Sequence, residues 1–325
     1  MSSISERPVS TLPSKDHGVK KVSVVVAVYY NEGSLPGLFA ELLEVEETLR
    51  QRDLQLELIF VDDGSGDGSL GELLKIKKKR ESTKVIKLTR NFGAVHASKT
   101  GLQFVTGDCF VILAADLQDP PELIPQMVDR WLDGAKYVIC ARADRGDPVT
   151  SKIFSYIFYK LVRLFVIRGY PAGGFDLALM DRAMLPYVQQ SGKNINPSLF
   201  TYWLGYEPTV LPYKRRQRTH LKSRWTFSKK LKLFLDSILG FSIVPIRVIS
   251  LIGVLVSLVS LGYGLSVVIS AILGKSEVRG FATLAGLISF LLGLVIVMLG
   301  VIGEYIWRIF DEINKRPETV IERIY

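Results

Sequence analysis

Two short segments combine acidic side chains with glycine, proline or amide residues directly after apolar runs. Residues 61–69 read Val-Asp-Asp-Gly-Ser-Gly-Asp-Gly-Ser, and residues 114–122 read Ala-Ala-Asp-Leu-Gln-Asp-Pro-Pro-Glu. The acids and glycines of the first segment suit binding of a ribose, a base or a metal-bound phosphate. In the second segment Asp116 and Gln118 stand two apart, and on an extended chain they point the same way. Such carboxylate and amide oxygens suit Mg²⁺ or Mn²⁺ bridging a diphosphate.

Both segments also have plainer interpretations. A calcium-binding loop requires glutamate at its twelfth position, and counted from Asp63 that position is Leu74, so this alternative fails. A simple Asp-Gly turn stays open for the first segment. In the second segment Asp119 could cap the helix that the next two prolines open, and this role is compatible with metal binding.

Two further polar segments follow apolar runs. Residues 29–33 (Tyr-Tyr-Asn-Glu-Gly) could contact a nucleotide. In residues 90–93 (Arg-Asn-Phe-Gly), Arg90 offers a forked hydrogen-bond donor and Gly93 permits close approach of the backbone. The three histidines are scattered along the chain, which argues against a histidine metal cluster.

A regular alternation of strands and helices positions these four segments. Strand-like apolar runs occupy residues 22–28, 56–61, 84–88, 109–113 and 137–141. Helical patterns occupy residues 34–49, 70–79, 93–105 and 121–132. This order predicts an α/β fold with a mostly parallel sheet covered on both faces. Because ligands bind at the carboxyl ends of such strands, the loops after the first, second and fourth strands are the expected site.

The remaining features of the N-terminal part are structural. Cys109 and Cys140 each lie in a strand-like run, so we expect two buried, reduced thiols and no disulfide. Residues 1–20 are polar, contain two prolines and lack the apolar stretch of a signal peptide, so we expect a disordered tail.

The last third of the chain is strongly apolar. Residues 248–273 and 281–303 carry no charged side chain, and each run exceeds the roughly 20 residues that cross a bilayer core. Residues 214–232 hold nine basic and no acidic residues, which predicts a cytoplasmic location for that side. Two spans return the C-terminus to the same side. Without internal charges the spans are expected to anchor the chain rather than to form a pore.

Three weaker patterns concern the membrane and other copies of the chain. Residues 152–166 form an amphipathic helix edged with basic and aromatic residues, which fits either the membrane interface or the core of the sheet domain. Residues 228–240 repeat this pattern. Glycines at 286, 293 and 300 recur every seven residues and predict helix contacts in a homo-oligomer. Residues 318–324 could form a short strand exchanged between copies.

In their order and spacing, four of these segments resemble glycosyltransferase family 2, and more narrowly its polyprenyl-phosphate branch of dolichyl-phosphate mannose synthase-like and bactoprenol glucosyltransferase-like enzymes. The segments are residues 28–32, 60–65, 90–93 and 116–121, and the resemblance extends from about residue 22 to the C-terminus. It implies a GT-A nucleotide-sugar-binding domain, followed by interfacial amphipathic helices and two transmembrane helices. It also implies inverting, metal-dependent transfer of a sugar to a lipid phosphate.

The resemblance assigns the donor side of the site. Asp63 would contact the nucleoside, with Tyr29, Glu32 and Arg90 nearby. This set would bind the nucleotide part of the sugar donor.

The resemblance also assigns the metal and the acceptor side. Asp116 and Gln118 would hold the Mg²⁺ or Mn²⁺ cofactor on the diphosphate, and Arg142 would meet the acceptor phosphate. A basic loop would close over the phosphates through Arg218, Lys222 and Ser223.

Three residues depart from the family pattern. Ala114 stands where an acid usually precedes the metal aspartate, which leaves fewer protein oxygens for the metal. Leu221 stands where the basic loop favours glycine, and Asp176 stands where a basic residue often follows Gly-Phe. We therefore expect a lower metal affinity or an altered metal geometry, and a stiffer loop. At position 176 either a basic partner is supplied from elsewhere or the acceptor is read differently.

These expectations define a five-part chain. The parts are a tail (1–20), a catalytic domain (21–227, with an interfacial helix at 150–168), a juxtamembrane helix (228–243), two spans (244–306) and a cytoplasmic tail (307–325). The catalytic domain and both termini are expected in the cytoplasm. The preferred reaction moves glucose from UDP-glucose to undecaprenyl phosphate.

Other functions fit parts of the sequence less well or leave the donor open. A mannosyl- or N-acetylhexosaminyl-transferase with the same acceptor fits the same motifs. A processive polysaccharide synthase would carry a Gln-x-x-Arg-Trp motif, which is missing, and more spans. A non-catalytic membrane scaffold is supported only by Ala114 and Leu221. A nucleic-acid binder is disfavoured because the basic run has few aromatic residues and adjoins a span.

Overall fold

The computed structural model describes residues 19–142, 149–216, 234, 236–273, 281–314 and 316–325. A mixed sheet of eight strands forms the centre of the N-terminal part, in the order β7-β5-β6-β4-β1-β2-β3-β8. Its strands are β1 (Lys21–Val28), β2 (Gln55–Asp62), β3 (Lys84–Leu88), β4 (Cys109–Ala114), β5 (Tyr137–Arg142), β6 (Phe175–Asp181), β7 (Thr209–Tyr213) and β8 (Ile321–Ile324).

Most neighbouring strands are parallel, as the sequence predicts. β1 pairs in parallel with β2 and β4, β2 with β3, and β5 with β7. β6 runs antiparallel between β4 and β5, and β8 runs antiparallel to β3. The predicted strands and the first four predicted helices are confirmed within a few residues at their ends. The sequence patterns missed β6, β7 and two short helices.

Helices cover both faces of the sheet. One face carries α1 (Leu35–Arg50), α2 (Ser69–Lys79) and α4 (Leu123–Leu132), whose apolar side chains pack on one side of β1, β2 and β4. The opposite face carries α3 (Ala94–Leu102), α5 (Val149–Phe165), α6 (Leu185–Gln189) and α7 (Pro197–Trp203), with the short 3₁₀ helix η1 (Arg182–Met184) before α6. Because both faces are buried, the central strands are continuously apolar.

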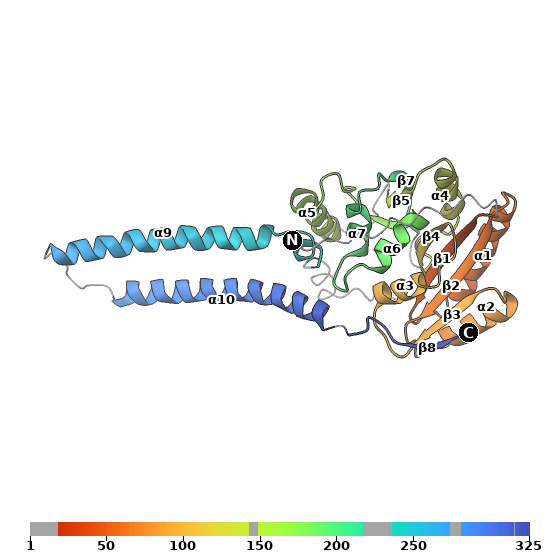
Figure 1. The fold of residues 1–325 in the computed structure, drawn as a ribbon, viewed down its shortest axis with the longest axis horizontal. Coiled ribbons are helices and arrows are strands. Elements are labelled where there is room, and N and C mark those ends of the chain that lie inside the picture. The colour runs from red at the N-terminus through yellow and green to blue at the C-terminus, as the bar shows by residue number, and fades with distance from the viewer. Residues whose placement is uncertain (1–18, 143–148, 217–233, 235, 274–280, 315) are drawn as a thin grey trace, which may run out of the picture.

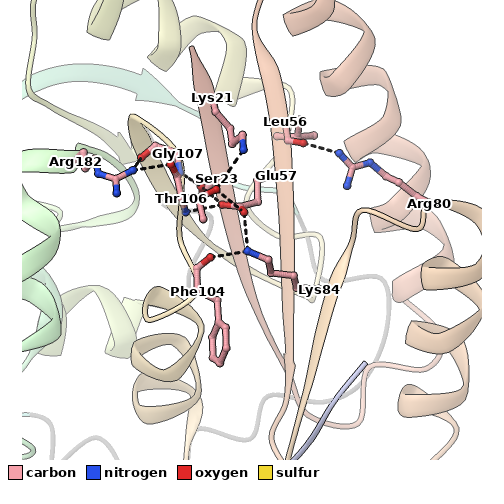
Figure 2. A network of polar contacts seen from close by, with 10 residues as sticks. All are labelled: Lys21, Ser23, Leu56, Glu57, Arg80, Lys84, Phe104, Thr106, Gly107 and Arg182. Atoms are coloured by element: carbon pink, nitrogen blue, oxygen red, sulfur yellow. Dashed lines mark hydrogen bonds and ion pairs between the residues drawn. The ribbon is translucent and has the colours of Figure 1, made fainter. Parts of the chain in front are cut away.

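A buried carboxylate joins several strands near their amino-terminal ends, opposite the polar loops (Figure 2). Glu57 accepts hydrogen bonds from Ser23 Oγ (2.6 Å), Lys84 Nζ (2.9 Å), Thr106 N (2.9 Å) and Thr106 Oγ1 (2.8 Å). It therefore ties β1, β2 and β3 to the loop before β4. The two cysteines, Cys109 and Cys140, are fully buried and unpaired, as predicted.

α5 has one face in the core, as one of the two interpretations of the sequence predicts, and the membrane-interface role stays a prediction. Phe158, Tyr159 and Val162 pack on the core of the sheet domain. Tyr156 and Leu164 are 61% and 65% exposed, and Ile157 and Phe165 are also exposed. One face of the helix is therefore core, and the other presents apolar and aromatic side chains outward.

Two long helices extend side by side away from the sheet domain (Figure 1). They are α9 (Val244–Ile272) and α10 (Phe281–Ile313), and each is long and apolar enough to cross a membrane. Both extend past the predicted spans, α10 by ten residues that include charged side chains. At this end Arg308 bonds Asp236 (2.7 Å), and Asn194 bonds Asp311 (2.7 Å), which docks α10 on the sheet domain.

The chain then returns to the sheet, where β8 pairs with β3 of the same chain. The predicted strand at the C-terminus is therefore present. The expected exchange between copies is not what this structure shows, because the tail that leaves α10 reaches its own sheet edge.

Candidate functional site

The loops after β1 and β2 are locked together by hydrogen bonds. Tyr30 N donates to Ser65 Oγ (3.1 Å), Asn31 N donates to Ser69 Oγ (2.8 Å), and Gly68 N donates to Glu32 Oε2 (3.0 Å). Gly68 is the residue before α2, so the Glu32 carboxylate lies at the positive end of that helix. The two predicted nucleotide-contact loops therefore form one unit.

This unit contains two aromatic rings in contact and one residue with a left-handed backbone conformation. The rings of Tyr29 and Tyr30 meet edge to face with centroids 4.7 Å apart. Tyr30 has a φ of 55°, an uncommon conformation for a bulky side chain. Strained backbone of this kind concentrates at functional sites.

Asp63 connects this unit to the loop after β3. Its side chain is 1% exposed, and its two oxygens accept from Phe92 N (2.7 Å) and Gly93 N (2.9 Å). Burial raises the pKa of Asp63, and these two bonds only partly oppose that shift. Arg90, in the same loop, is exposed and lies 4.0 Å above the Phe92 ring. The predicted donor residues Tyr29, Glu32, Asp63 and Arg90 therefore lie on three interconnected loops.

Asp116 and Gln118 lie in a tight turn rather than on an extended segment. Leu117 between them has a φ of 59°, and Gln118 N donates to Asp116 Oδ1 (3.2 Å). The expectation that they share one direction because the chain is extended is therefore wrong. β4 ends at Ala114, so both residues lie beyond the strand and outside its extended backbone.

Asp119 does not cap the next helix. The residue before α4 is Glu122, which makes no side-chain capping bond, while Asp119 is buried and faces β7. Its Oδ1 accepts from the Tyr213 hydroxyl (2.8 Å) and lies 3.3 Å from Arg215 Nε. The alternative role that the sequence suggested for Asp119 is thus replaced by a tertiary contact.

Arg142 at the end of β5 pairs with Asp176 on β6. The guanidinium makes a two-pronged contact in which Nη2 lies 2.8 Å from Asp176 Oδ1 and Nε contacts Oδ2. The Tyr213 hydroxyl lies 2.9 Å from Asp176 Oδ2 and so bridges Asp176 and Asp119. Burial alone would raise the pKa of Asp176, but the Arg142 contacts outweigh it and lower that pKa. Burial and the nearby Asp176 charge raise the pKa of Asp119.

Arg142, the residue expected to meet the acceptor phosphate, pairs with the acid at position 176. How the acceptor is recognised at this position stays a prediction. Tyr213 and Arg215 were missed as parts of this cluster because β7 was not recognised in the sequence, and Asp176 was named only as a departure from the family pattern.

The basic segment after β7 starts beside the Asp116 turn. Arg216 N donates to Gln118 O (3.1 Å), and its guanidinium contacts Glu41 (2.7 Å) and Glu122 (2.9 Å). Arg218, Lys222 and Ser223, together with Leu221, lie outside the described residues. Arg216, two residues before Arg218, nevertheless lies beside the Asp116 turn.

The metal expectation is compatible with the donor set of the turn. The described part of the chain contains no group of three or more His, Cys, Asp or Glu side chains that could hold a metal alone. Mg²⁺ is commonly held by one or two carboxylates together with substrate phosphates. Asp116 supplies such a carboxylate and Gln118 a neutral oxygen, so the residues fit an ion shared with a diphosphate.

Comparisons with known proteins identify the family of the chain. Residues 23–188 match the family model described as glycosyl transferase family 2. An uncharacterized glycosyltransferase of Synechocystis is 33% identical over 94% of this chain and 96% of its own length. The prophage bactoprenol glucosyl transferase homolog of Escherichia coli is 30% identical over 94% of this chain and 99% of its own. The bactoprenol glucosyl transferase of Shigella phage SfX is 31% identical over 93% and 99%. The chain belongs to glycosyltransferase family 2, with a GT-A fold, in the branch that includes the bactoprenol glucosyl transferases.

Proposed function

We propose that this protein transfers a hexose, with glucose from UDP-glucose as the preferred donor, to a polyprenyl phosphate such as undecaprenyl phosphate. One observation carries the proposal. Relatives named bactoprenol glucosyl transferase match at least 93% of this chain and 98% of their own, so the similarity includes both apolar helices. A mannosyl or N-acetylhexosaminyl donor is the alternative that the assay below separates.

The donor binds on the interlocked loops. The nucleoside lies at the carboxyl end of β2, where the buried Asp63 holds the loop that it meets, with Tyr29 offering a ring face and Arg90 a positive charge. Glu32 keeps the loop before α2 closed through Gly68 N. Because Asp63 holds the Phe92 and Gly93 amides, one carboxylate orders two loops of the donor site.

The leaving diphosphate lies at the Asp116 turn. Asp116 and Gln118 would hold Mg²⁺ or Mn²⁺ there, and the ion would supply positive charge that stabilises the leaving diphosphate. The reaction inverts the anomeric centre, since the phosphate oxygen forms its bond to that carbon on the face opposite the departing nucleoside diphosphate.

The acceptor needs no general base. A polyprenyl phosphate oxygen is already anionic near pH 7, so the protein only has to bring two anionic groups together. Arg142 contacts the acceptor phosphate, and the basic loop with Arg218, Lys222 and Ser223 closes over both phosphates.

The membrane arrangement places the sheet domain next to the lipid acceptor. The exposed face of α5 lies in the interface (residues 150–168), α9 and α10 cross the bilayer, and the basic run 214–232 lies on the cytoplasmic side. The sheet domain and both termini are then cytoplasmic. The spans also provide contacts for a homo-oligomer through the glycine face of α10, where Gly293 and Gly300 have no neighbouring atom within 4 Å of a built Cβ.

A transfer assay tests the proposal. Purified full-length protein is given radiolabelled UDP-glucose and undecaprenyl phosphate, with Mg²⁺, with Mn²⁺ or with EDTA, and the lipid product is quantified. We expect a metal-dependent product, and loss of about 100-fold or more in Asp116→Ala, as is typical when a charge-stabilising group is removed. Asp133→Ala, an exposed acid after α4, is the control with unchanged rate.

Three outcomes would change the assignment. Product from GDP-mannose or UDP-N-acetylglucosamine but not from UDP-glucose would replace the donor. Full activity of Asp116→Ala would refute the metal assignment. No product with any donor would refute the transferase proposal and favour the scaffold.

A further inference from the structure

The chain that follows α10 contacts the helix that follows the donor loop. Glu318 Oε1 lies 2.7 Å from Lys99 Nζ, and Glu318 Oε2 lies 3.5 Å from His96 Nδ1. Thr319 Oγ1 lies 2.6 Å from Thr100 Oγ1. All three partners belong to α3, and the tail residues lie immediately before β8.

These contacts are sheltered from solvent. The Lys99 side chain is 13% exposed and also contacts the Ser191 carbonyl, and the Glu318 side chain is 26% exposed. Burial would raise the pKa of Glu318, but the contacts with His96 and Lys99 outweigh it and lower that pKa. Glu318 is therefore a half-buried anion held by α3, unlike the mobile ion pairs of an open surface.

α3 is bound to the proposed donor site at its first turn. Gly93 precedes the helix, and the amides of Phe92 and Gly93 are the two groups that donate to Asp63 (2.7 and 2.9 Å). Ala97 N in turn donates to Gly93 O (3.0 Å). A displacement of α3 therefore displaces the amides that hold Asp63.

The opposite side of α3 lies tightly on the sheet. A Cβ built on Gly101 would lie 2.4 Å from Val25 Cγ1 and 3.0 Å from Val61 Cγ2. The helix cannot move closer to the sheet, because packed interiors resist even small overlaps. Only motion along its axis or away from the sheet is left, and Glu318 and Thr319 oppose both from the outer side.

We propose that Glu318 is a positioning residue for the nucleotide-sugar donor. By holding Lys99 it fixes α3, and α3 fixes the Phe92 and Gly93 amides on Asp63. Since Glu318 follows the end of α10 by five residues, the order of the donor site depends on the tail of the membrane anchor. This inference rests on the proposed donor role of Asp63.

Glu318→Gln tests the inference, with Glu322→Gln as the matched control. Gln keeps the shape of the side chain and removes its charge. Glu322 belongs to the same tail, but it pairs with Lys87 on β3 (2.7 Å) and its side chain is 47% exposed. Binding of UDP by full-length protein in detergent is measured by calorimetry, and KM and kcat are measured for the donor.

We expect Glu318→Gln to weaken UDP binding and to raise the donor KM by about tenfold, the effect of losing one charged hydrogen bond, with kcat nearly unchanged. Glu322→Gln should match wild type. Thr319→Val, which loses the hydroxyl contact with Thr100, should give a smaller shift in the same direction and serves if Glu318→Gln does not fold.

Two results would overturn parts of the argument separately. A Glu318→Gln variant that binds UDP like wild type, or that only unfolds at a lower temperature, would refute the positioning role. Wild-type protein that binds no UDP and no other nucleotide would instead refute the proposed function.

Discussion

At the scale of single residues, the donor loops depend on a position that tolerates no side chain. Gly64 has a φ of +68°, and a Cβ built on it would lie 2.6 Å from the Arg90 carbonyl carbon and 2.7 Å from the Arg90 Cα. The close approach allows the two loops to share Asp63. Glycine is required here because both the conformation and the space exclude other residues.

Gly64→Ala is therefore expected to destabilise the sheet domain by about 2–4 kcal/mol, the sum of left-handed strain and overlap, and to weaken donor binding. Thermal unfolding in detergent measures the first effect. Gly71→Ala is the control, because Gly71 lies inside α2 with no atom within 4 Å of a built Cβ, so alanine should stabilise the helix by up to about 1 kcal/mol. Equal melting temperatures for the two variants would contradict this account.

Glu57 holds together the amino-terminal ends of the strands, at the end of the sheet opposite the donor loops (Figure 2). Burial would raise its pKa, but hydrogen bonds from Ser23, Thr106 and Lys84 outweigh burial and lower the pKa below its ordinary 4.5. A carboxylate with a depressed pKa stabilises the fold above its unfolded pKa. That stability is lost as the pH falls through the folded pKa.

Glu57→Gln should cost about 3 kcal/mol at neutral pH, because the new amide group meets donors and Lys84 loses its partner. Between about pH 5 and about pH 3 the variant should lose less stability than wild type, since it has no carboxylate to protonate. Unfolding midpoints over this range measure both effects. Glu44→Gln, on the exposed side of α1, should follow the wild-type curve. Parallel curves for Glu57→Gln and wild type would show that Glu57 does not set the acid limit.

At the scale of elements, α5 is the helix that we propose joins the sheet domain to the membrane. Val162 and its neighbours are core, whereas Tyr156 and Leu164 are exposed. We expect a helix with this division to lie with its exposed face in the headgroup region. The apolar outer face would otherwise remain in contact with water.

A cysteine at position 156 that carries an environment-sensitive dye should report an apolar surrounding in lipid nanodiscs. Leu43→Cys on α1, 42% exposed and far from the long helices in Figure 1, should report water. Both native cysteines are fully buried, so labelling is confined to the new site. The same emission from both positions would place α5 away from the membrane.

At the scale of the whole molecule, the position of the tail constrains how the two candidate spans can cross a membrane. β8 belongs to the same sheet as β1, so the start of α9 and the end of α10 lie on one side. Two crossings satisfy this condition and a single crossing does not. The hairpin is fastened at its base by Arg308 and Asp311, which contact the sheet domain.

Cysteine accessibility in sealed vesicles tests this arrangement. Ser276→Cys, in the connector between α9 and α10, should react with a membrane-impermeant maleimide from the side opposite to Leu43→Cys. The positive-inside rule predicts that Leu43→Cys is on the cytoplasmic side. Reaction of both positions from the same side would refute the two-span topology.

Much of the fold was predictable because the relevant forces are local along the chain. The runs that became β1 to β5 are continuously apolar because both faces of the sheet are covered, and the helices between them show one apolar face each. β6, α6, α7 and β7 were missed because they are short, or because their neighbours in the sheet lie far away in the sequence. The antiparallel position of β6 is a property of the assembled sheet.

In the candidate site, the types of residue follow from the sequence and their partners follow from the tertiary structure. The sequence by itself determined which residues can do chemistry, since carboxylates, amides and glycines at strand ends are chemical facts of the chain. Only the tertiary structure decided their partners: Asp63 with the Phe92 and Gly93 amides, Arg142 with Asp176, and Glu318 with α3. These partners are separated by 29 to 219 residues, and no periodicity reports such contacts, because they depend on how distant elements pack.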